Sequence, residues 1–391
     1  MIKNTPPMGW NSWNTFGGSI NEQLIFDTAD KIVETGLLEL GYEYLVIDDC
    51  WSLRERDENG RLVADPKKFP HGMKAVADYI HSKGLKFGMY SCAGNLTCGG
   101  YPGSFEHEFI DAKTFAEWGV DFLKYDYCYH SNIIHGKYLY RRMGLALKNC
   151  GRDILFSACT WGADNTAEWI RETGANMWRS TGDIVDTWQS VKNLTEQQEA
   201  IFPYGGAGSF NDMDMLIVGM YGKGNVGIDG LNDTQYKTHF SIWAMLGSPL
   251  MIGCDIRNMN KETLDILSNK ELIKINQDAD CRQVIKLSLF EGSNIKAYAR
   301  TLENGDIAVG FFNLTDKNVT VKFLLDELGL PESTGKTLEM HEVWTGETVT
   351  VKNGTLIRGI EAFDSLVYRC KVGDAYCPAV FDAEKSLTAL I

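Results

Sequence analysis

Short apolar runs alternate with amphipathic segments along roughly the first 276 residues of the chain. Each apolar run ends in polar residues, as a buried strand does where it meets a loop. The segments between the runs have the three-to-four-residue spacing of helices with one buried face. Several of these segments are followed by glycine, the residue preferred just past the end of a helix. Eight such strand–helix units in succession predict a (β/α)8 barrel, a TIM barrel, over residues 1–279.

The element boundaries follow from this alternation. The predicted strands are 8–13, 44–49, 85–90, 120–126, 154–159, 177–179, 213–218 and 249–255. The predicted helices include 23–35, 73–82, 110–118, 137–149, 187–200, 234–246 and 261–276. A doubly wound sheet is the alternative arrangement of strands and helices, but the chain lacks the glycine-rich phosphate loop of that fold.

The pattern changes after residue 276 to short runs with the two-residue alternation of strands. A favourable hairpin turn at 303–306 joins two of them. The runs predict an antiparallel β-sandwich over residues 280–372, to which we assign no chemistry. The tail 373–391 has no predicted role. The strand-like runs are 295–300, 307–312, 319–323, 341–344, 348–351 and 364–369.

Composition excludes some classes of partner. The 391 residues carry a net charge of −14 and no cluster of lysine and arginine, so nucleic acid and anionic membranes are not expected partners. No apolar run approaches the roughly 18 residues of a membrane span. The first residues lack the basic and apolar regions of a signal peptide, so we expect a cytoplasmic protein. Both a monomer and an oligomer remain open.

Cysteine and histidine spacing argues against a metal site. The ten cysteines form no CxxC pair, and the seven histidines have no ligand spacing with them. We expect no metal and no cofactor, and most cysteines should be small buried side chains.

Lys124 and Asp126 close the predicted strand 120–126 and are difficult to explain by folding alone. Residues two apart on a strand share a face, so both side chains point into the same space. Buried charges are costly unless they are paired or used, so the pair is either a satisfied ion pair or part of a site. In a (β/α)8 barrel, active sites lie where strands end. Other polar or reactive residues fall at such ends, namely Asp48, Asp49, Tyr90, Cys159, Thr160, Trp161, Arg179, Asp183, Asp214 and Asp255.

Two carboxylates on either side of a sugar are the minimum for glycoside hydrolysis. Asp126 is the candidate nucleophile, because the ammonium of Lys124 should keep it ionised. Asp183, on a loop past strand 177–179, is the candidate acid/base, and we expect fewer cations near it. Alternatively, Asp183 caps a helix at 184–191. A non-catalytic sugar-binding barrel is a further alternative, but it would require the loss of one carboxylate.

Several motifs together resemble glycoside hydrolase family 27 of clan D, the α-galactosidases. They include Met-Gly-Trp-Asn-Ser-Trp (8–13), Ile-Asp-Asp-Cys-Trp (47–51), Lys-Tyr-Asp-Tyr-Cys (124–128) and Asn-Asp-Met-Asp-Met-Leu (211–216). The resemblance covers about residues 5–370. It implies a retaining exo-glycosidase that removes terminal α-linked galactose from oligosaccharides or glycoconjugates by double displacement. Asp126 would be the nucleophile and Asp183 the general acid/base.

The resemblance also implies substrate contacts. Asp48 and Asp49 would bind the 4- and 6-hydroxyls through charge-assisted hydrogen bonds. Cys98 and Cys128 match a family disulfide beside the pocket. Cys50 matches a half-cystine whose partner position is Gly18 here, so a second disulfide is absent. The remaining implied pocket residues are Lys124, Trp161 and Arg179, with Trp13, Tyr90 and Met215 as apolar walls.

Thr160 and Ala163 depart from the α-galactosidase pattern. Many members have a glutamate at the first position and a larger residue at the second, and both positions flank the C2 substituent of the sugar. Small residues there resemble the related α-N-acetylgalactosaminidases, which is the alternative function. A β-L-arabinopyranosidase is a more remote alternative. The Asp48–Asp49 pair favours a pocket that accommodates O6, and we place galactose first.

Overall fold

The computed structural model describes residues 2–290 and 293–373. It divides the chain into two compact units, which separate between Val284 and Ile285. Apart from Gly373, the predicted tail lies outside the described residues. None of the helices in these ranges combines the length and apolar character needed to cross a membrane.

The first unit is built on eight parallel strands in the order β7-β6-β5-β4-β3-β2-β1-β8. A parallel bridge between Leu216 and Ile252 links the segment after β7 to β8, which closes the ring. The predicted (β/α)8 barrel is therefore confirmed. Its strands are β1 (Met8–Asn11), β2 (Tyr44–Val46), β3 (Lys86–Cys92), β4 (Phe122–Asp126), β5 (Leu155–Cys159), β6 (Met177–Arg179), β7 (Phe210–Asp212) and β8 (Leu250–Ile252).

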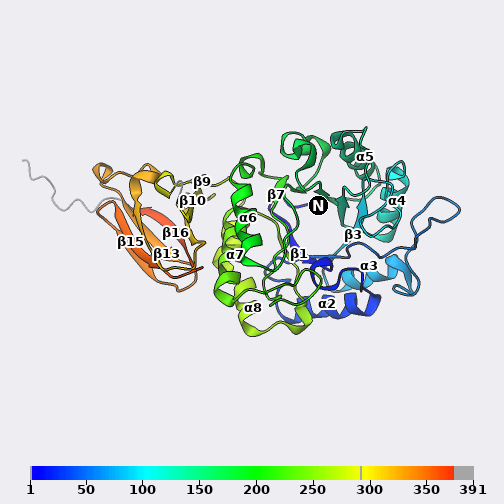
Figure 1. Ribbon diagram of the computed structural model, residues 1–391, viewed down its shortest axis with the longest axis horizontal. Helices are drawn as coiled ribbons and strands as arrows, with labels where there is room; N and C mark the ends of the chain where they lie inside the picture. Colours follow the sequence, from blue (N-terminus) through cyan, green and yellow to red (C-terminus); the bar gives the residue numbers. More distant parts are fainter. Residues whose placement is uncertain (1, 291–292, 374–391) are drawn as a thin grey trace, which may run out of the picture. The chain divides into compact units, whose positions relative to one another are not determined.

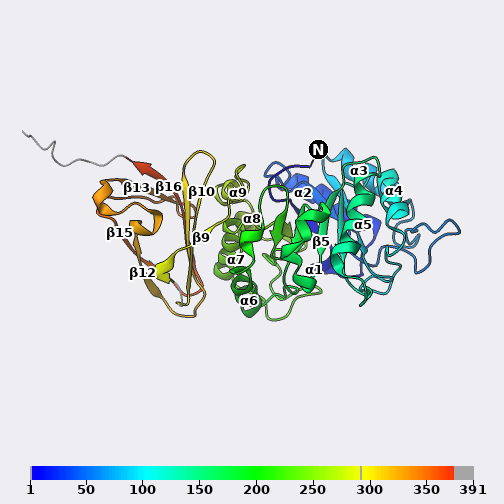
Figure 2. The same cartoon turned by 90° about the horizontal axis from the view of Figure 1, so that it is seen from above.

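Helices surround this ring in both views (Figures 1 and 2). Side chains fix several helix starts by accepting backbone N–H bonds, as Asn21 does from Leu24 and Asn232 does from Gln235. The helices are α1 (Trp13–Phe16), α2 (Glu22–Glu34), α3 (Gly72–Ser82), α4 (Glu108–Trp118), α5 (Gly136–Lys148), α6 (Trp188–Gln198), α7 (Asp233–Met245), α8 (Lys261–Leu267) and α9 (Lys270–Asn276). Short 3-10 turns of this unit are η1 (Ala163–Glu168), η2 (Ile170–Thr173), η3 (Phe202–Tyr204) and η4 (Ile256–Asn258).

Two predicted elements are wrong in detail. The helix predicted at 261–276 is two helices, because Asn269 caps a new start at α9 by accepting from the N–H of Leu272. The strand predicted at 213–218 lies earlier, as β7. Asp212 ends that strand by accepting from the N–H of Asp214, whose φ of 80° turns the chain out of the sheet.

The second unit is antiparallel, with a six-stranded sheet in the order β14-β13-β16-β11-β10-β9 and a two-stranded sheet of β12 and β15. Apolar side chains such as Phe311, Phe323 and Met340 form one core. The predicted sandwich is confirmed, although β9 and β15 were not foreseen. The strands are β9 (Ile285–Lys286), β10 (Ile295–Thr301), β11 (Ile307–Asn313), β12 (Val319–Leu324), β13 (Thr337–Glu342), β14 (Thr348–Val351), β15 (Thr355–Ile360) and β16 (Ser365–Gly373), with 3-10 turns η5 (Ser288–Phe290), η6 (Leu325–Leu328) and η7 (Glu332–Thr334).

Candidate active site

A cavity of about 200 Å³ opens among the carboxyl ends of the barrel strands. This is the end of the barrel at which this fold places its active sites. Most residues predicted for the site line this one cavity, including both candidate catalytic carboxylates. The lining side chains are Trp13, Asn14, Asp48, Asp49, Tyr90, Cys98, Lys124, Asp126, Cys159, Trp161, Arg179, Asp183, Ile184, Val185, Asp214, Met215 and Val226.

Asp126 is the last residue of β4 and is 6% exposed. One carboxylate oxygen accepts from the N–H of Tyr127 at 2.9 Å, and the other accepts from the hydroxyl of Tyr90 at 3.0 Å. Burial raises the pKa of Asp126 to about 6, against the lowering effect of Lys124. Because the carboxylate is ionised above this pH and contacts no cation directly, it is available as a nucleophile.

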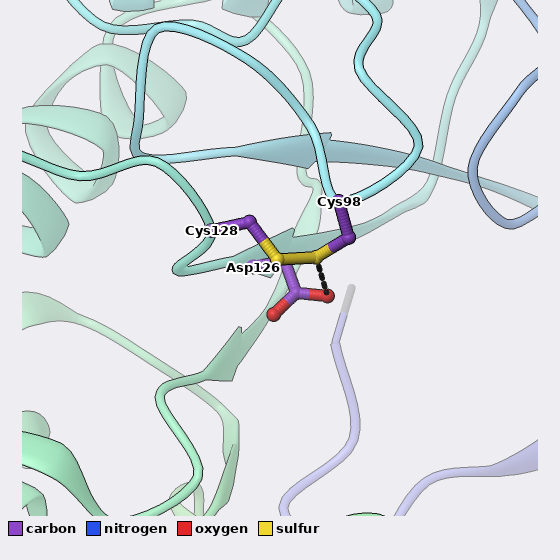
Figure 3. Close-up of side chains that lie close together, drawn as sticks. All are labelled: Cys98, Asp126 and Cys128. Carbon is purple, nitrogen blue, oxygen red and sulfur yellow. Dashed lines mark hydrogen bonds between the residues drawn. A yellow bond between two sulfur atoms is a disulfide. The ribbon is translucent and has the colours of Figure 1, made fainter.

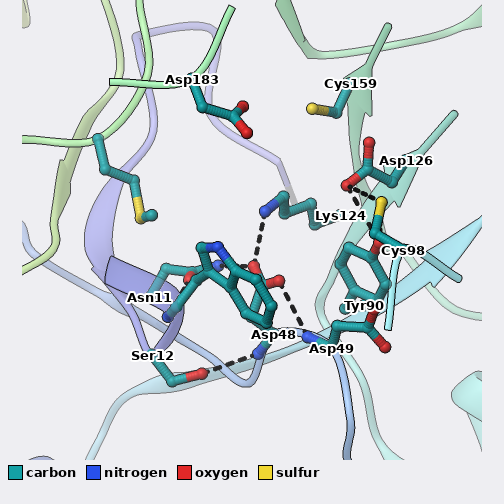
Figure 4. Close-up of polar contacts among 12 residues, drawn as sticks. Asn11, Ser12, Asp48, Asp49, Tyr90, Cys98, Lys124, Asp126, Cys159 and Asp183 are labelled. Carbon is teal, nitrogen blue, oxygen red and sulfur yellow. Dashed lines mark hydrogen bonds and ion pairs between the residues drawn. The ribbon is translucent and has the colours of Figure 1, made fainter. Parts of the chain in front are cut away.

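Lys124 lies on the same face of β4, as predicted, but its partner differs from the expected one. Its Nζ donates to Oδ2 of Asp48 at 2.7 Å (Figure 4). Burial alone would lower the pKa of Lys124, but the carboxylates of Asp48 and Asp126 outweigh burial and raise it. We expected Lys124 to determine the ionisation of Asp126, and this expectation is wrong. The ammonium lowers the pKa of Asp126, but burial has the larger effect.

Asp48 and Asp49 follow β2 and are each 2% exposed. Asp48 is fixed by the amide of Asn11, which donates to Oδ2 at 2.8 Å, and by Lys124. Asp49 accepts from the N–H of Gly99 at 2.7 Å and from that of Cys50 at 2.6 Å. Burial raises the pKa of Asp49. Both carboxylates are thus held in place by other groups and present fixed acceptors at the cavity wall.

Asp183 lies on the loop after β6, and its side chain is 68% exposed. It does not cap a helix, because α6 begins later and is capped by Thr187. Nη2 of Arg179 lies 3.0 Å from its Oδ1. Partial burial would raise the pKa of Asp183, but Arg179 and Lys124 lower it below the ordinary value. The expectation of fewer cations near Asp183 is wrong, because the loop folds back onto the guanidinium.

The predicted disulfide between Cys98 and Cys128 is present (Figure 3). Sγ of Cys98 lies 3.5 Å from Oδ2 of Asp126, so the bridge borders the candidate nucleophile. Within the described residues, these two cysteines and Asp126 are also the one cluster with metal-ligand spacing. Their sulfur atoms are bonded to each other, so they offer no thiolates to a metal. Cys98 lines the cavity and Cys128 lies behind it.

Cys50 is a free cysteine that faces Gly18. A Cβ placed on Gly18 would lie 3.2 Å from the Sγ of Cys50 and 3.3 Å from its Cβ. The sequence resemblance paired these two positions, and the structure brings them together. The second disulfide is absent because one of its cysteines is a glycine here.

Thr160 and Ala163, which the sequence resemblance places beside the sugar, are not among the residues that line the cavity. Thr160 is 1% exposed, and its hydroxyl forms a short hydrogen bond with that of Thr166 in η1. The side chain therefore packs behind the wall formed by Cys159 and Trp161. Asp255 is also outside the cavity, because it caps η4 and binds Arg257.

Some residues that support or line the cavity were not proposed as site residues from the sequence. Asn11 ends β1 and Ser12 follows it. Both hold the lining residue Asp48, the first by its amide and the second by accepting from the N–H of Asp48 at 3.0 Å. Their position at a strand end was the available signal. Cys159, which the sequence analysis named only as a residue at a strand end, lines the cavity near Asp126 (Figure 4). Val226 comes from the long loop after β7, and nothing in its sequence context pointed to the site.

A larger cleft of about 460 Å³ lies at the opposite ends of the strands. It is lined by residues that precede β5 and β6, such as Ile154 and Asn176, and by one side of α5. Residues at this end of a (β/α)8 barrel serve stability rather than chemistry. The carboxylates that could act on a sugar converge on the smaller cavity instead.

Comparisons with known proteins agree with this geometry. The family model described as alpha galactosidase A matches residues 5–278, and the model of the alpha galactosidase C-terminal beta sandwich domain matches residues 292–370. The chain is 42% identical to an alpha-galactosidase of Cyamopsis tetragonoloba, covering 93% of this chain and 85% of the relative. It is 44% identical to an alpha-galactosidase of Coffea arabica, covering 93% of each. A structure of the Saccharomyces cerevisiae alpha-galactosidase with raffinose superimposes with a TM-score of 0.86 at 31% identity, covering 94% of this chain and 98% of that one. The chain therefore belongs to the α-galactosidase family of glycoside hydrolases.

Proposed function

We propose that this protein hydrolyses terminal α-linked galactosides with retention of anomeric configuration. One observation carries the proposal: two carboxylates of different character, Asp126 and Asp183, line one cavity together with the acceptor pair Asp48–Asp49. Asp126 is buried and bonded to neutral donors, whereas Asp183 is open to the cavity mouth. This difference suits a nucleophile and an acid/base.

In the proposed first step, the Asp126 carboxylate attacks the anomeric carbon while the bond to the leaving oxygen breaks. Asp183 gives its proton to that oxygen. In the second step, Asp183 takes a proton from water, which attacks the anomeric carbon and releases Asp126. The sugar therefore leaves with its original configuration after two inversions.

Galactose is the proposed sugar because of Asp48 and Asp49. Two fixed acceptors side by side can bind the axial 4-hydroxyl and the 6-hydroxyl, each with a charge-assisted hydrogen bond. A β-L-arabinopyranoside lacks the second of these hydroxyls and would leave one acceptor without a partner. The family membership of the chain and the raffinose in the yeast relative also support an oligosaccharide with a terminal α-galactose.

The geometry does not favour an α-N-acetylgalactosaminidase. That alternative depended on a space beside Thr160 and Ala163, and neither side chain lines the cavity. The groups of this strand end that do line it are the thiol of Cys159 and the ring of Trp161. Nitrophenyl α-galactoside assayed beside its N-acetylgalactosaminide tests this preference directly.

The mechanism has a separate test. Proton NMR during hydrolysis should show α-galactose before mutarotation, and Asp126→Asn should abolish turnover while the protein stays folded. Asp183→Ala should slow substrates with poor leaving groups most, since activated aryl galactosides need little proton donation. Asp186→Asn is the matched control, because that carboxylate is buried nearby and bonded to Tyr236. First appearance of the β-anomer, or full activity of Asp126→Asn, would refute the assignment.

A further inference from the structure

Arg179 is shared between two carboxylates that come from different segments. Its Nη2 lies 3.0 Å from Asp183, and its Nη1 lies 3.0 Å from Oδ1 of Asp214. The side chain of Arg179 is 5% exposed. Its Nη2 also donates to the carbonyls of Thr181 and Gly182. The cation therefore has one carboxylate partner inside the barrel wall and one at the cavity mouth.

Asp214 is buried and is held by two backbone N–H groups as well as by Arg179. Its Oδ1 also accepts from the N–H of Met215 at 2.8 Å, and its Oδ2 accepts from the N–H of Ile184 at 2.7 Å. Ile184 directly follows Asp183 in the chain, so Asp214 fixes the backbone beside the candidate acid/base. Asp214 itself has a φ of 80°, a strained conformation that folds keep where a site requires it.

We propose that Asp214 is a positioning residue for the acid/base: it holds the Asp183 loop through Ile184 and takes up part of the charge of Arg179, so that Asp183 can bind the proton it must donate. This inference rests on the proposed function. Asp214 touches neither the leaving oxygen nor the attacked carbon in that mechanism, and it acts through Arg179 and Asp183.

The charges around these groups give the direction of the effect. Asp183 faces Arg179 and Lys124, both of which favour its ionised form. Asp214 faces Arg179, Asp183 and Asp212, and its negative charge opposes ionisation of Asp183. The remaining group beside Arg179 is the Cys159 thiol, at 3.9 Å, whose pKa burial raises well above its ordinary value. Removing the charge of Asp214 therefore leaves Arg179 wholly to Asp183 and lowers the pKa of Asp183 further.

Asp214→Asn tests the inference. Asparagine tolerates a positive φ and retains one acceptor oxygen, so the strained turn can persist. Since a smaller fraction of the enzyme then has Asp183 protonated, kcat/KM for a galactoside with a poor leaving group should fall about tenfold at neutral pH. The value of kcat/KM for an activated aryl galactoside should change by about twofold at most, since that substrate needs little proton donation.

A loss of folded protein would instead lower kcat/KM for both substrates by the same factor. Asp186→Asn provides this comparison, because Asp186 is buried and accepts from Tyr236 and from the N–H of Gly222 without contacting Arg179. In an Asp183→Ala background, adding Asp214→Asn should change activity less than twofold on the aryl galactoside. An unchanged ratio of kcat/KM between the two substrates in folded Asp214→Asn, or a further tenfold loss in the double variant, overturns the inference. Absence of α-galactosidase activity in the unaltered enzyme would refute the proposed function instead.

Discussion

Asp126→Asn should stabilise the barrel at neutral pH while abolishing turnover. Burial raises the pKa of Asp126 from 3.8 to about 6, so the folded protein resists the charge that the reaction needs. The amide is nearly the same size as the carboxylate and can still accept from the N–H of Tyr127. Its NH2 group can donate to the Tyr90 hydroxyl in place of the bond that Tyr90 now donates.

The magnitude follows from the difference in pKa between the folded and unfolded states. A difference of about 2 units corresponds to about 3 kcal/mol. Below about pH 4, Asp126 is protonated in both states and the charge costs nothing. As the pH rises through the interval from about 4 to about 6, the unfolded chain ionises first and the wild type loses stability. Above about pH 6 the wild type has lost the full amount of unfolding free energy. The asparagine variant loses none of it, because its side chain does not ionise.

The assay is urea unfolding of both proteins at several pH values, followed by tryptophan fluorescence. Nine of the ten tryptophans precede residue 280, so the signal reports mainly on the barrel. The variant's advantage in unfolding free energy should grow by about 3 kcal/mol between pH 4 and pH 7. Asp121→Asn should show no such change above about pH 4, because His81 and Arg152 lower the pKa of Asp121 despite its burial and its carboxylate is ionised in both states there. A constant difference between wild type and Asp126→Asn across this range would refute the reasoning.

Two further changes test other parts of the site. Gly18→Cys should form a disulfide with Cys50 after a shift of a few tenths of an ångström, and closing a loop of roughly 33 residues should add up to about 3.7 kcal/mol. Its measure is the thermal midpoint with and without reductant, beside Gly18→Ser and wild type; a bond that forms without raising the midpoint contradicts the prediction. Thr160→Val should cost about 1 kcal/mol by removing the buried hydrogen bond to Thr166. It should leave the ratio of kcat/KM for galactoside and N-acetylgalactosaminide within about twofold, and a tenfold change would show that residue 160 faces the sugar.

The barrel could be predicted because its signal is repeated. Each strand has an apolar run and each helix an amphipathic face, so errors in single elements do not change the fold. The seventh strand shows where this signal fails. The run 213–218 is as apolar as a strand, but the side chain of Asp212 captures the N–H of Asp214 and turns the chain. A side-chain-to-backbone hydrogen bond of this kind does not change the spacing of apolar and polar residues, so the sequence pattern does not predict it.

The sequence predicted the placement of a site residue correctly where its position along a strand determines the direction of its side chain. Lys124 and Asp126 share a face because residues two apart on a strand must do so. Thr160 was expected to face the sugar, but the loop after β5 turns its hydroxyl onto Thr166, a contact that strand position does not predict. Arg179 and Asp183 were both named, but their contact depends on a loop that is neither helix nor strand. Sequence reasoning therefore found the members of the site and missed the pairing of its charges.

That pairing bears on how the site can work. The cavity contains two buried cations, and both are bonded to carboxylates other than the nucleophile: Lys124 to Asp48, and Arg179 to Asp214 and Asp183. Asp126 is left with neutral donors, which hold its orientation without neutralising its charge. A direct ion pair would make the carboxylate more stable but less reactive toward carbon. Keeping this charge buried and without an ion pair lowers the stability of the fold. The same arrangement makes the carboxylate more reactive toward the anomeric carbon of the substrate.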